Sequence, residues 1–501
     1  MKFHIGLDFG TYQSKVCVYS LEGKTHEFFR FSNTGTFFLP SRVGCREDET
    51  FEYGPLSDNL CLKEYHYFKI ASAEDEEFHV ETFERGKGRQ HHLYREEEFA
   101  PFTAEFLSVL YLTNLLFTVK DHYLRSREKK DTRSGFLKKL FTTASSSEHS
   151  FTIQLGIPTE WSQLKNLRRK RKFENILMIC ELLQKHYRTH LDFLKATSSE
   201  LKGVVGDIYS TIELQNAAQL ELKLHELGIS VFPETAAGLT FIVKSKQLQT
   251  GYYAIMDIGG GTTDISFFSV EPGNNIKYLA SESYIIAANN VYKKIANNPY
   301  SIKAVHEAEQ GLKVLIQSGA EIKDEWVRKA LVEVRDALNK LVYKLFNRRV
   351  YFFKKGMIDG YNGQPILLYG GGSRLPSFNE GSVLIHDNGS PLSITIPVTY
   401  MEKQKIEDYT SNLALLPMDQ SWKKDFPVLV VALGLSFVKP DSFADWFGEE
   451  DYHWKDVPKP GSKRGSSKWG EESDTTRSVQ HPQNEDYYLF NVLASRWNRS
   501  L

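Results

Sequence analysis

The sequence has few cysteines, no long apolar run and no large excess of one charge, and each of these features argues against particular classes of protein. The chain of 501 residues has four cysteines and no CxxC pair, so neither a disulfide framework nor a cysteine-rich metal site is expected. Lysine plus arginine number 62 and aspartate plus glutamate 63, a balance that favours neither nucleic acid nor an anionic membrane as a partner. The composition is typical of a globular protein in a reducing compartment.

No segment has the form of a membrane span or of a secretory signal. The longest good apolar run, Phe426 to Val438, is too short to cross a bilayer and contains a proline. The N-terminus reaches Asp8 too early for the apolar core of a signal peptide. We therefore expect a soluble, cytoplasmic protein, and the length predicts two or three lobes.

Hydrophobic periodicity and turn residues predict alternating strands and helices. Hairpins are expected over 3–18 and 252–270, and strands over 151–158 and 365–369. Helices are expected over 102–122, 162–190, 214–227 (capped by Gly228), 304–316 and 325–345. Residues 125–150 are basic and then serine-rich, which is typical of an exposed loop, and 426–438 are apolar enough for either a helix or a strand.

The most informative pattern occurs twice. The first copy reads Gly6-Leu7-Asp8-Phe9-Gly10-Thr11, and the second reads Met256-Asp257-Ile258-Gly259-Gly260-Gly261-Thr262-Thr263-Asp264. In each copy an apolar strand ends in aspartate, a glycine turn with threonine follows, and a second apolar strand begins. Glycines let backbone N–H groups approach an anion, and threonine adds a hydroxyl donor. Aspartates beside phosphate require an intervening cation, for which Mg2+ with its retained waters is the natural choice.

A third glycine cluster, Gly370-Gly371-Gly372-Ser373-Arg374, follows the strand predicted at 365–369. Taken alone, it fits an ordinary glycine-rich loop as well as a functional one. The functional interpretation is a close backbone approach to a nucleoside, with Arg374 lying against the base.

In order and form, these three segments resemble the two phosphate loops and the adenosine loop of the actin-like ATPase superfamily. A fourth segment, Phe232-Pro233-Glu234-Thr235-Ala236-Ala237-Gly238-Leu239, resembles the connecting segment of the DnaK-type heat-shock protein 70 chaperones. It lacks the proline that this family usually has between Glu and Thr. The resemblance covers residues 2–439 and implies an α/β fold of two ribonuclease H-like lobes with a nucleotide cleft between them.

This resemblance and the changes in composition predict a division of the chain. Residues 1–249 form lobe I with insertions, 250–425 form lobe II with the adenosine loop, and 426–445 pack back on lobe I. Residues 446–501 form a flexible tail that ends in an apolar segment, which either packs on the core or docks a partner. The peptide-binding domain of the chaperones is not recognisable.

The resemblance also implies a role for each motif residue. The waters around Mg2+ are held by Asp8 and Asp257, and the attacking water lies near Glu234 and Asp264. The phosphates are contacted by Gly10, Thr11, Tyr12, Gly259, Gly260, Gly261 and Thr262, with Thr262 nearest the γ-phosphate. The adenosine is held by Gly371, Gly372 and Arg374.

Three basic features complete the set of candidates. Lys69, in Tyr67-Phe68-Lys69-Ile70-Ala71, matches the catalytic lysine of the family chaperones, and the alternative is a solvated surface lysine. Lys313 matches a lysine on the family's adenine-facing helix, although its surroundings differ. The basic run from Arg168 to Lys172 is better explained as a solvated helix face than as a nucleic-acid site, because the net charge is balanced.

The leading hypothesis is an ATP-binding, Mg2+-dependent ATPase that acts as a nucleotide-driven conformational switch. It would hydrolyse ATP to ADP and phosphate and signal its state to a protein partner through an insertion or the tail. Three alternatives stay open: an actin-like filament-forming or scaffold protein, a small-molecule kinase of the same superfamily, and nucleotide binding without turnover.

Overall fold

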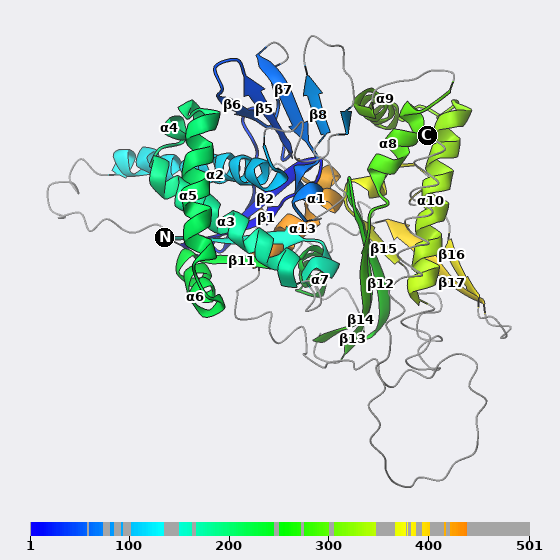
Figure 1. Cartoon of the computed structure of the whole chain (residues 1–501). Coiled ribbons are helices and arrows are strands. Elements are labelled where there is room, and N and C mark those ends of the chain that lie inside the picture. Colours follow the sequence, from blue (N-terminus) through cyan, green and yellow to red (C-terminus); the bar gives the residue numbers. More distant parts are fainter. Residues whose placement is uncertain are drawn as a thin grey trace, which may run out of the picture.

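The computed structural model describes residues 2–57, 60–73, 81–84, 92–93, 102–134, 150–162, 167–244, 250–271, 275–299, 305–346, 366–376, 378, 382–386, 393–400, 415–416 and 421–437. Within these ranges the chain has a mixed α/β architecture, with three sheets and helices packed around them (Figure 1). The predicted tail, 446–501, lies outside the described residues.

The first sheet contains β1 (Lys2–Asp8), β2 (Gln13–Ser20), β3 (Thr25–Phe28), β4 (Leu39–Pro40), β10 (Ser150–Ile157), β11 (Ile229–Pro233) and β18 (Leu415–Leu416). Its strand order is β11-β10-β1-β2-β3-β18, with β4 paired to β2. β1 runs antiparallel to β2 and parallel to β10, and β10 runs parallel to β11. The predicted N-terminal hairpin is therefore present, at the centre of this sheet.

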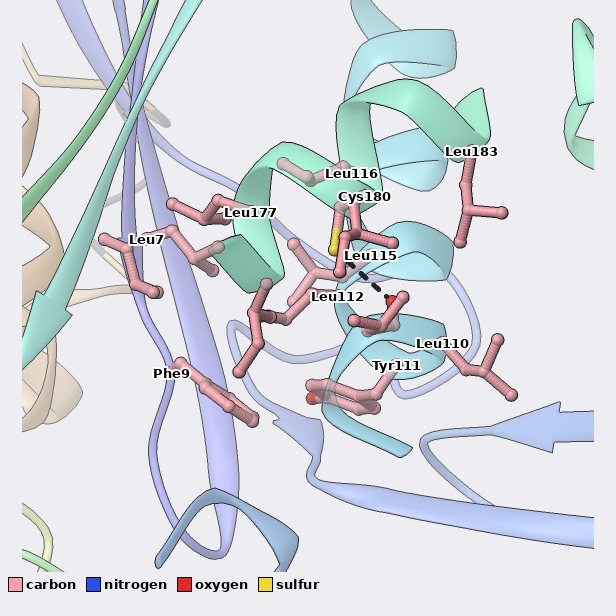
Figure 2. Packing of buried hydrophobic residues seen from close by; sticks show 14 of the residues in the cluster. Leu7, Phe9, Leu110, Tyr111, Leu112, Leu115, Leu116, Leu177, Cys180 and Leu183 are labelled. Atoms are coloured by element: carbon pink, nitrogen blue, oxygen red, sulfur yellow. Dashed lines mark hydrogen bonds between the residues drawn. The ribbon is translucent and has the colours of Figure 1, made fainter. Parts of the chain in front are cut away.

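Two long helices build the core beside the first sheet. They are α2 (Ala104–Ser134) and α3 (Leu167–Tyr187). Leu7 of β1 belongs to the same buried cluster as Leu112 of α2 and Leu177 of α3 (Figure 2). Cys180 is also buried there, and its thiol donates to the carbonyl of Val109 at 3.4 Å. Removing this apolar surface from water is the main force that holds the end of β1 in place.

The second sheet contains β12 (Gly251–Ile258), β13 (Thr263–Glu271), β14 (Asn275–Tyr284), β15 (Ile366–Tyr369), β16 (Ser382–His386) and β17 (Ser393–Tyr400). Its strand order is β14-β13-β12-β15-β17-β16. β12 runs antiparallel to β13 and parallel to β15, which runs parallel to β17. Its buried apolar partners come from α8 (Ala288–Ala296), α9 (Val305–Ser318) and α10 (Glu325–Leu345).

The two sheets share one strand order and one set of strand directions. Read from the edge at which neighbouring strands are antiparallel, the strand order is β3-β2-β1-β10-β11 in the first sheet and β14-β13-β12-β15-β17 in the second. In each, the earliest strand lies in the middle, with its hairpin partner on one side and two later parallel strands on the other. Asp8 and Asp257 lie at equivalent places, near the end of that middle strand. The repeated motif therefore belongs to a repeated structural unit.

Two helices lie between the sheets and join them. They are α7 (Glu234–Lys244) and α13 (Phe426–Phe437). The buried cluster around them includes Cys17 from the first sheet and Phe268 from the second. They pack very closely, because a Cβ on Gly434 would lie only 1.8 Å from the carbonyl oxygen of Ala237. The apolar run of ambiguous structure is thus a helix, and it contacts β1, β2 and β10 as well as α7.

The remaining elements form a third sheet, short helices and the connections between the strands described above. A third sheet, ordered β6-β5-β7-β8-β9, contains β5 (Arg42–Arg46), β6 (Phe51–Tyr53), β7 (Cys61–His66), β8 (Glu81–Glu84) and β9 (His92–Leu93). The short helix α1 (Phe68–Ala73) follows β7. Between β10 and β11 lie η2 (Thr159–Ser162), α4 (His190–Lys195), α5 (Ser198–Glu213) and α6 (Ala217–Leu227) in addition to α3. Two further 3-10 turns are η5 (Gly372–Arg374) and η6 (Lys423–Asp425).

The structure differs from the sequence-based expectation in several places, among them the helices α1, α7 and α8, which the sequence patterns do not predict. α2 continues to Ser134, whereas a loop was expected from residue 125, and α5 was not predicted at all. α5 contains two glycines that weaken a helical pattern. Its start is nevertheless capped by the Thr197 hydroxyl, which accepts from the backbone N–H of Glu200 at 3.3 Å, and its face is buried through Leu201 and Ile212.

No helix in the described ranges is long and apolar enough to cross a membrane.

Candidate functional site

The first glycine turn joins β1 to β2 and carries a buried ion pair. Asp8 lies directly across the hairpin from Lys15, and the Lys15 ammonium is 2.9 Å from Asp8 Oδ2. Both side chains are buried. The turn is held by Ser41, whose hydroxyl donates to the Gly10 carbonyl at 2.6 Å and whose N–H donates to the Tyr12 carbonyl at 2.8 Å.

The second glycine turn joins β12 to β13 and carries a pair of like charges. Asp257 lies directly across this hairpin from Asp264, and both are buried. The Gly259 N–H donates to the Thr262 carbonyl at 2.9 Å and closes the turn. The start of α8 supports it, since the Asn289 N–H donates to the Gly260 carbonyl at 2.8 Å.

The two turns face each other at very short range. A Cβ on Gly260 would lie 1.9 Å from the ring of Tyr12, and one on Gly261 would lie 3.0 Å from the Thr11 side chain. A side chain at Gly260 would displace the Tyr12 ring, and one at Gly261 would also displace Ile70 of α1, which would lie 2.2 Å from the added Cβ. The structure thus brings together the two turns whose residues are predicted to contact phosphate.

Lys69 meets Glu234 beside the turns. Lys69 comes from α1 and Glu234 from the start of α7, and the ammonium is 2.7 Å from Glu234 Oε1. The Lys69 side chain is only 4% exposed, so the alternative of a solvated surface lysine is wrong. Burial raises the pKa of Glu234, and the charge of Asp8 adds to this, while Lys69 acts in the opposite direction.

Asp264 is fixed from two directions. Its carboxylate accepts from the Thr159 N–H at 2.9 Å and from the Ser283 hydroxyl. Burial raises the pKa of Asp264 to about 7, and the neighbouring charge of Glu234 contributes. Burial also raises the pKa of Asp257 well above its usual range, reinforced by Glu234, Asp264 and Asp8.

These contacts define a buried charge cluster of six side chains: Asp8, Lys15, Lys69, Glu234, Asp257 and Asp264. With every group ionised, four carboxylates and two ammoniums sum to a net charge of −2. Such a surplus in a buried place requires either protonation or a cation. In the described part of the chain no three His, Cys, Asp or Glu side chains are grouped to hold a metal directly. The four carboxylates of the cluster are oxygen donors of the kind with which proteins hold divalent cations.

The third glycine cluster packs against the second turn. Gly370 has φ +85°, and a Cβ there would lie 2.2 Å from Asp257 Oδ1, so glycine is needed for Asp257 to fit. A Cβ on Gly372 would lie 2.5 Å from Ile258, whereas nothing lies within 4 Å at Gly371. The predicted adenosine loop is thus adjacent to the second phosphate loop.

Two predicted nucleoside contacts have other partners in the structure. Arg374 donates to the Lys424 carbonyl at 2.6 Å and forms an ion pair with Asp425 at 2.9 Å, just before α13. Lys313 is exposed on α9 and pairs with Glu309. Glu309 is buried and raises the pKa of Tyr12, after the larger effects of burial and Tyr67. α9 therefore faces the first glycine turn through Glu309 rather than Lys313.

Sequence reasoning missed Lys15 and Glu309. Lys15 continues the alternating pattern of β2 at a position opposite Asp8, so the hairpin register was the available signal. Glu309 lies four residues before Lys313 on the same helix face. The structure adds both to the candidate site.

The basic run on α3 is neutralised within the chain. Arg171 pairs with Glu174 at 3.0 Å and with Glu221 of α6 at 2.8 Å, and Lys172 pairs with Glu105 of α2 at 3.2 Å. These ion pairs link three helices. The run therefore has a structural role in joining α3 to α2 and α6.

No protein-family model matches this chain, and no curated protein matches it.

Proposed function

We propose that this chain is an ATP-binding, Mg2+-dependent ATPase with a two-lobed actin-like fold. The observation that carries the proposal is the buried charge cluster at the meeting point of two equivalent hairpins. Two glycine turns that face each other offer backbone donors to a phosphate chain from both sides. The surplus of two negative charges beside them suits one divalent cation, which would also offset the charge of the phosphates.

The arrangement of strands supports the fold assignment. The order β3-β2-β1-β10-β11 recurs as β14-β13-β12-β15-β17, with the same directions. Two copies of one unit, each with an Asp-glycine turn near the end of its middle strand, are what the resemblance to actin-like ATPases implies. In this proposal the first sheet belongs to lobe I, the second to lobe II, and the cluster around α7 and α13 forms the hinge.

The residues present fit Mg2+ through their waters, with Asp8 and Asp257 as the carboxylates that hold them. When bound, the cation would neutralise charge on the phosphate oxygens. Thr262 would donate to the terminal phosphate from the second turn. Lys69, oriented by Glu234, would stabilise the charge that develops on the same phosphate.

Asp264 is the proposed general base. A carboxylate with a pKa of about 7 is half deprotonated at neutral pH, which suits the removal of a proton from an attacking water. The Thr159 N–H and the Ser283 hydroxyl hold its orientation. Water would attack the γ-phosphorus, its proton would pass to Asp264, and ADP would leave with the electron pair of the broken P–O bond.

Binding and hydrolysis of the nucleotide would change the orientation of one lobe relative to the other. The helices between them are packed too tightly to compress, so closure would proceed by rotation about them. In this proposal the switch acts on a protein partner. The exposed sides of the helices α4 to α6 are available for this contact.

The decisive experiment is Mg2+-ATP binding and single-turnover hydrolysis by the full chain and three variants. Asp257→Ala should lose Mg2+-dependent binding. Lys69→Ala should bind but lose turnover by about 10²- to 10³-fold. Lys120→Ala is the matched control, because it removes another ion-paired ammonium, which is partly buried and bound to Glu181 away from the cluster.

Each outcome has a defined meaning. Wild-type turnover that falls in the first two variants and not in Lys120→Ala supports the proposal. Absence of Mg2+-ATP binding by the wild type rejects it. Binding without turnover leaves a nucleotide-binding protein and removes the assignment of Asp264 as base.

A further inference from the structure

Tyr12 lies across the junction of the two sheets. Its hydroxyl donates to Asn289 Oδ1 at 2.5 Å, a contact between residues 277 apart in the chain. Its ring packs edge-on against Tyr292 of α8, with centroids 6.0 Å apart, and against the backbone of Gly260. A side chain of the first turn is therefore anchored to the helix that supports the second turn.

Tyr67 extends this contact back to Lys69. The Tyr67 hydroxyl donates to the Tyr12 oxygen at 3.2 Å, and the two rings meet edge-on at 5.2 Å. Tyr67 has φ +60°, a left-handed conformation that is unfavourable for a residue with a large side chain. It is followed immediately by α1, in which Lys69 is the second residue. The position of α1 is thus linked to the position of Tyr12.

We infer that Tyr12, Tyr67 and Asn289 form a clasp between the two halves of the molecule that positions Lys69 against the second glycine turn. This inference rests on the proposed ATPase for its consequence, although the clasp itself can be tested without nucleotide. The three residues are positioning residues, because they act through Lys69 and through the Gly260 turn.

The hydrogen bonds run in one direction through the clasp. Tyr67 donates to Tyr12, Tyr12 donates to the side chain of Asn289, and the Asn289 N–H donates to the Gly260 carbonyl. This series of hydrogen bonds therefore connects Tyr67 to the backbone of the second turn. Burial, then Tyr67 and Glu309, raise the pKa of Tyr12, so that hydroxyl stays protonated and able to donate.

A side chain that only filled space would not need this hydroxyl. The Tyr12 ring alone satisfies the packing against Gly260 and Tyr292, as a phenylalanine would. The hydroxyl adds a link that forms only when both halves are in register. Its loss should therefore loosen the junction and displace Lys69 while leaving the folded halves intact.

The test uses the full chain with Tyr12→Phe, Asn289→Ala and the double variant, with Tyr123→Phe as matched control. Tyr123 also has a buried hydroxyl, which donates to Glu27 at 2.8 Å, but both residues belong to the first half. Spin labels at Leu222→Cys and Lys329→Cys, both exposed sites, report the distance between the halves without nucleotide. The Cys45→Ser background removes the one cysteine that is not buried.

A broader, longer distance distribution is expected in Tyr12→Phe and in Asn289→Ala, with no further change in the double variant. Tyr123→Phe should match the wild type. Unchanged distances in both single variants would overturn the clasp, as would effects that simply add in the double variant.

The functional consequence is read separately with a fluorescent ADP analogue and single-turnover hydrolysis. Each single variant should release the analogue about two- to tenfold faster, the range for one lost hydrogen bond. The single-turnover rate at saturating ATP should fall as well, because Lys69 is displaced. Normal turnover at saturation alongside altered distances would overturn the link to Lys69. A wild type that binds no analogue rejects the ATPase proposal instead, and the distance measurement still decides the clasp.

Discussion

The two glycine-turn hairpins have the same backbone plan and opposite electrostatics. In the first, the residue across from the aspartate is a lysine, and Asp8 and Lys15 form an ion pair of 2.9 Å. In the second, the residue across from the aspartate is another aspartate, and Asp257 and Asp264 repel each other. Opposite charges across a strand pair stabilise it, and like charges destabilise it.

This difference assigns distinct tasks to the two hairpins. In the first hairpin the charges of Asp8 and Lys15 balance each other, so this hairpin can be rigid without a ligand. In the second hairpin no cationic side chain of either strand lies across from the two buried aspartates. Burial and the neighbouring carboxylates raise the pKa values of both aspartates. We therefore expect the second hairpin to hold the ligand-dependent chemistry and the first to serve as the fixed wall.

The largest effect should come from neutralising Asp264, the proposed base on the second hairpin. Asp264→Asn keeps the size of the side chain but cannot accept a proton, so turnover should fall by about 10²- to 10⁴-fold with Mg2+-ATP binding retained. The wild-type rate should rise with pH through about 7, and the variant's residual rate should not. Asp207→Asn, on the exposed side of α5, is the control. A variant that turns over normally would remove Asp264 from the mechanism.

Removing one aspartate from each hairpin should change stability in opposite directions. Asp8→Asn leaves the buried Lys15 without its ion-pair partner and should lower the free energy of unfolding by about 3 kcal/mol. Asp257→Asn removes a like-charge contact and should raise it by about 1 kcal/mol in the absence of Mg2+. Urea denaturation at pH 8 in a chelator measures both values. Equal losses in the two variants would show that the hairpins are electrostatically alike.

The glycines of the second hairpin turn and of the third glycine cluster differ in the space around them. A Cβ at Gly260 would lie 1.9 Å from the Tyr12 ring, while the space around Gly371 is open to 4 Å. Gly260→Ala should therefore cost about 1–3 kcal/mol of unfolding free energy through overpacking, and Gly371→Ala should change it by less than about 0.5 kcal/mol. Thermal denaturation compares the two. Similar values would mean that the turns do not meet as closely as described.

Much of this site could be read from local patterns. Alternating apolar residues followed by aspartate and glycine predict each hairpin. Gly228, which has φ +66°, predicts the end of α6. Lys69 could be named only through resemblance, since an isolated lysine after β7 has no local signature. Its partner Glu234 lies 165 residues away, and only the tertiary fold brings the two charged groups to 2.7 Å.

What escaped prediction depends on pairing and on tertiary contacts. Lys15 gains meaning only in the register of β1 and β2, because a shift of one residue would turn it to the other face. The equivalence of the two sheets depends on the positions that β10, β11, β15 and β17 take in the strand order. A short segment of sequence does not show which strand will be its neighbour. The link from Tyr12 to Asn289 likewise exists only once the two sheets meet.

The smallest and most diagnostic effect is the pH dependence of stabilisation by Mg2+. Because the folded pKa of Asp264, about 7, exceeds its ordinary value of 3.8, the metal-free fold is favoured when this group is protonated and loses stability as pH rises through 7. One proton contributes at most about 1.4 kcal/mol per pH unit. A divalent cation favours the ionised form, so Mg2+ should raise the melting temperature more at pH 8 than at pH 6. Asp264→Asn should reduce that difference, whereas Asp336→Asn, an exposed aspartate on α10, should preserve it. An increase of equal size at both pH values would mean that the cation does not compensate the second hairpin, and the contrast between the two hairpins would then concern packing alone.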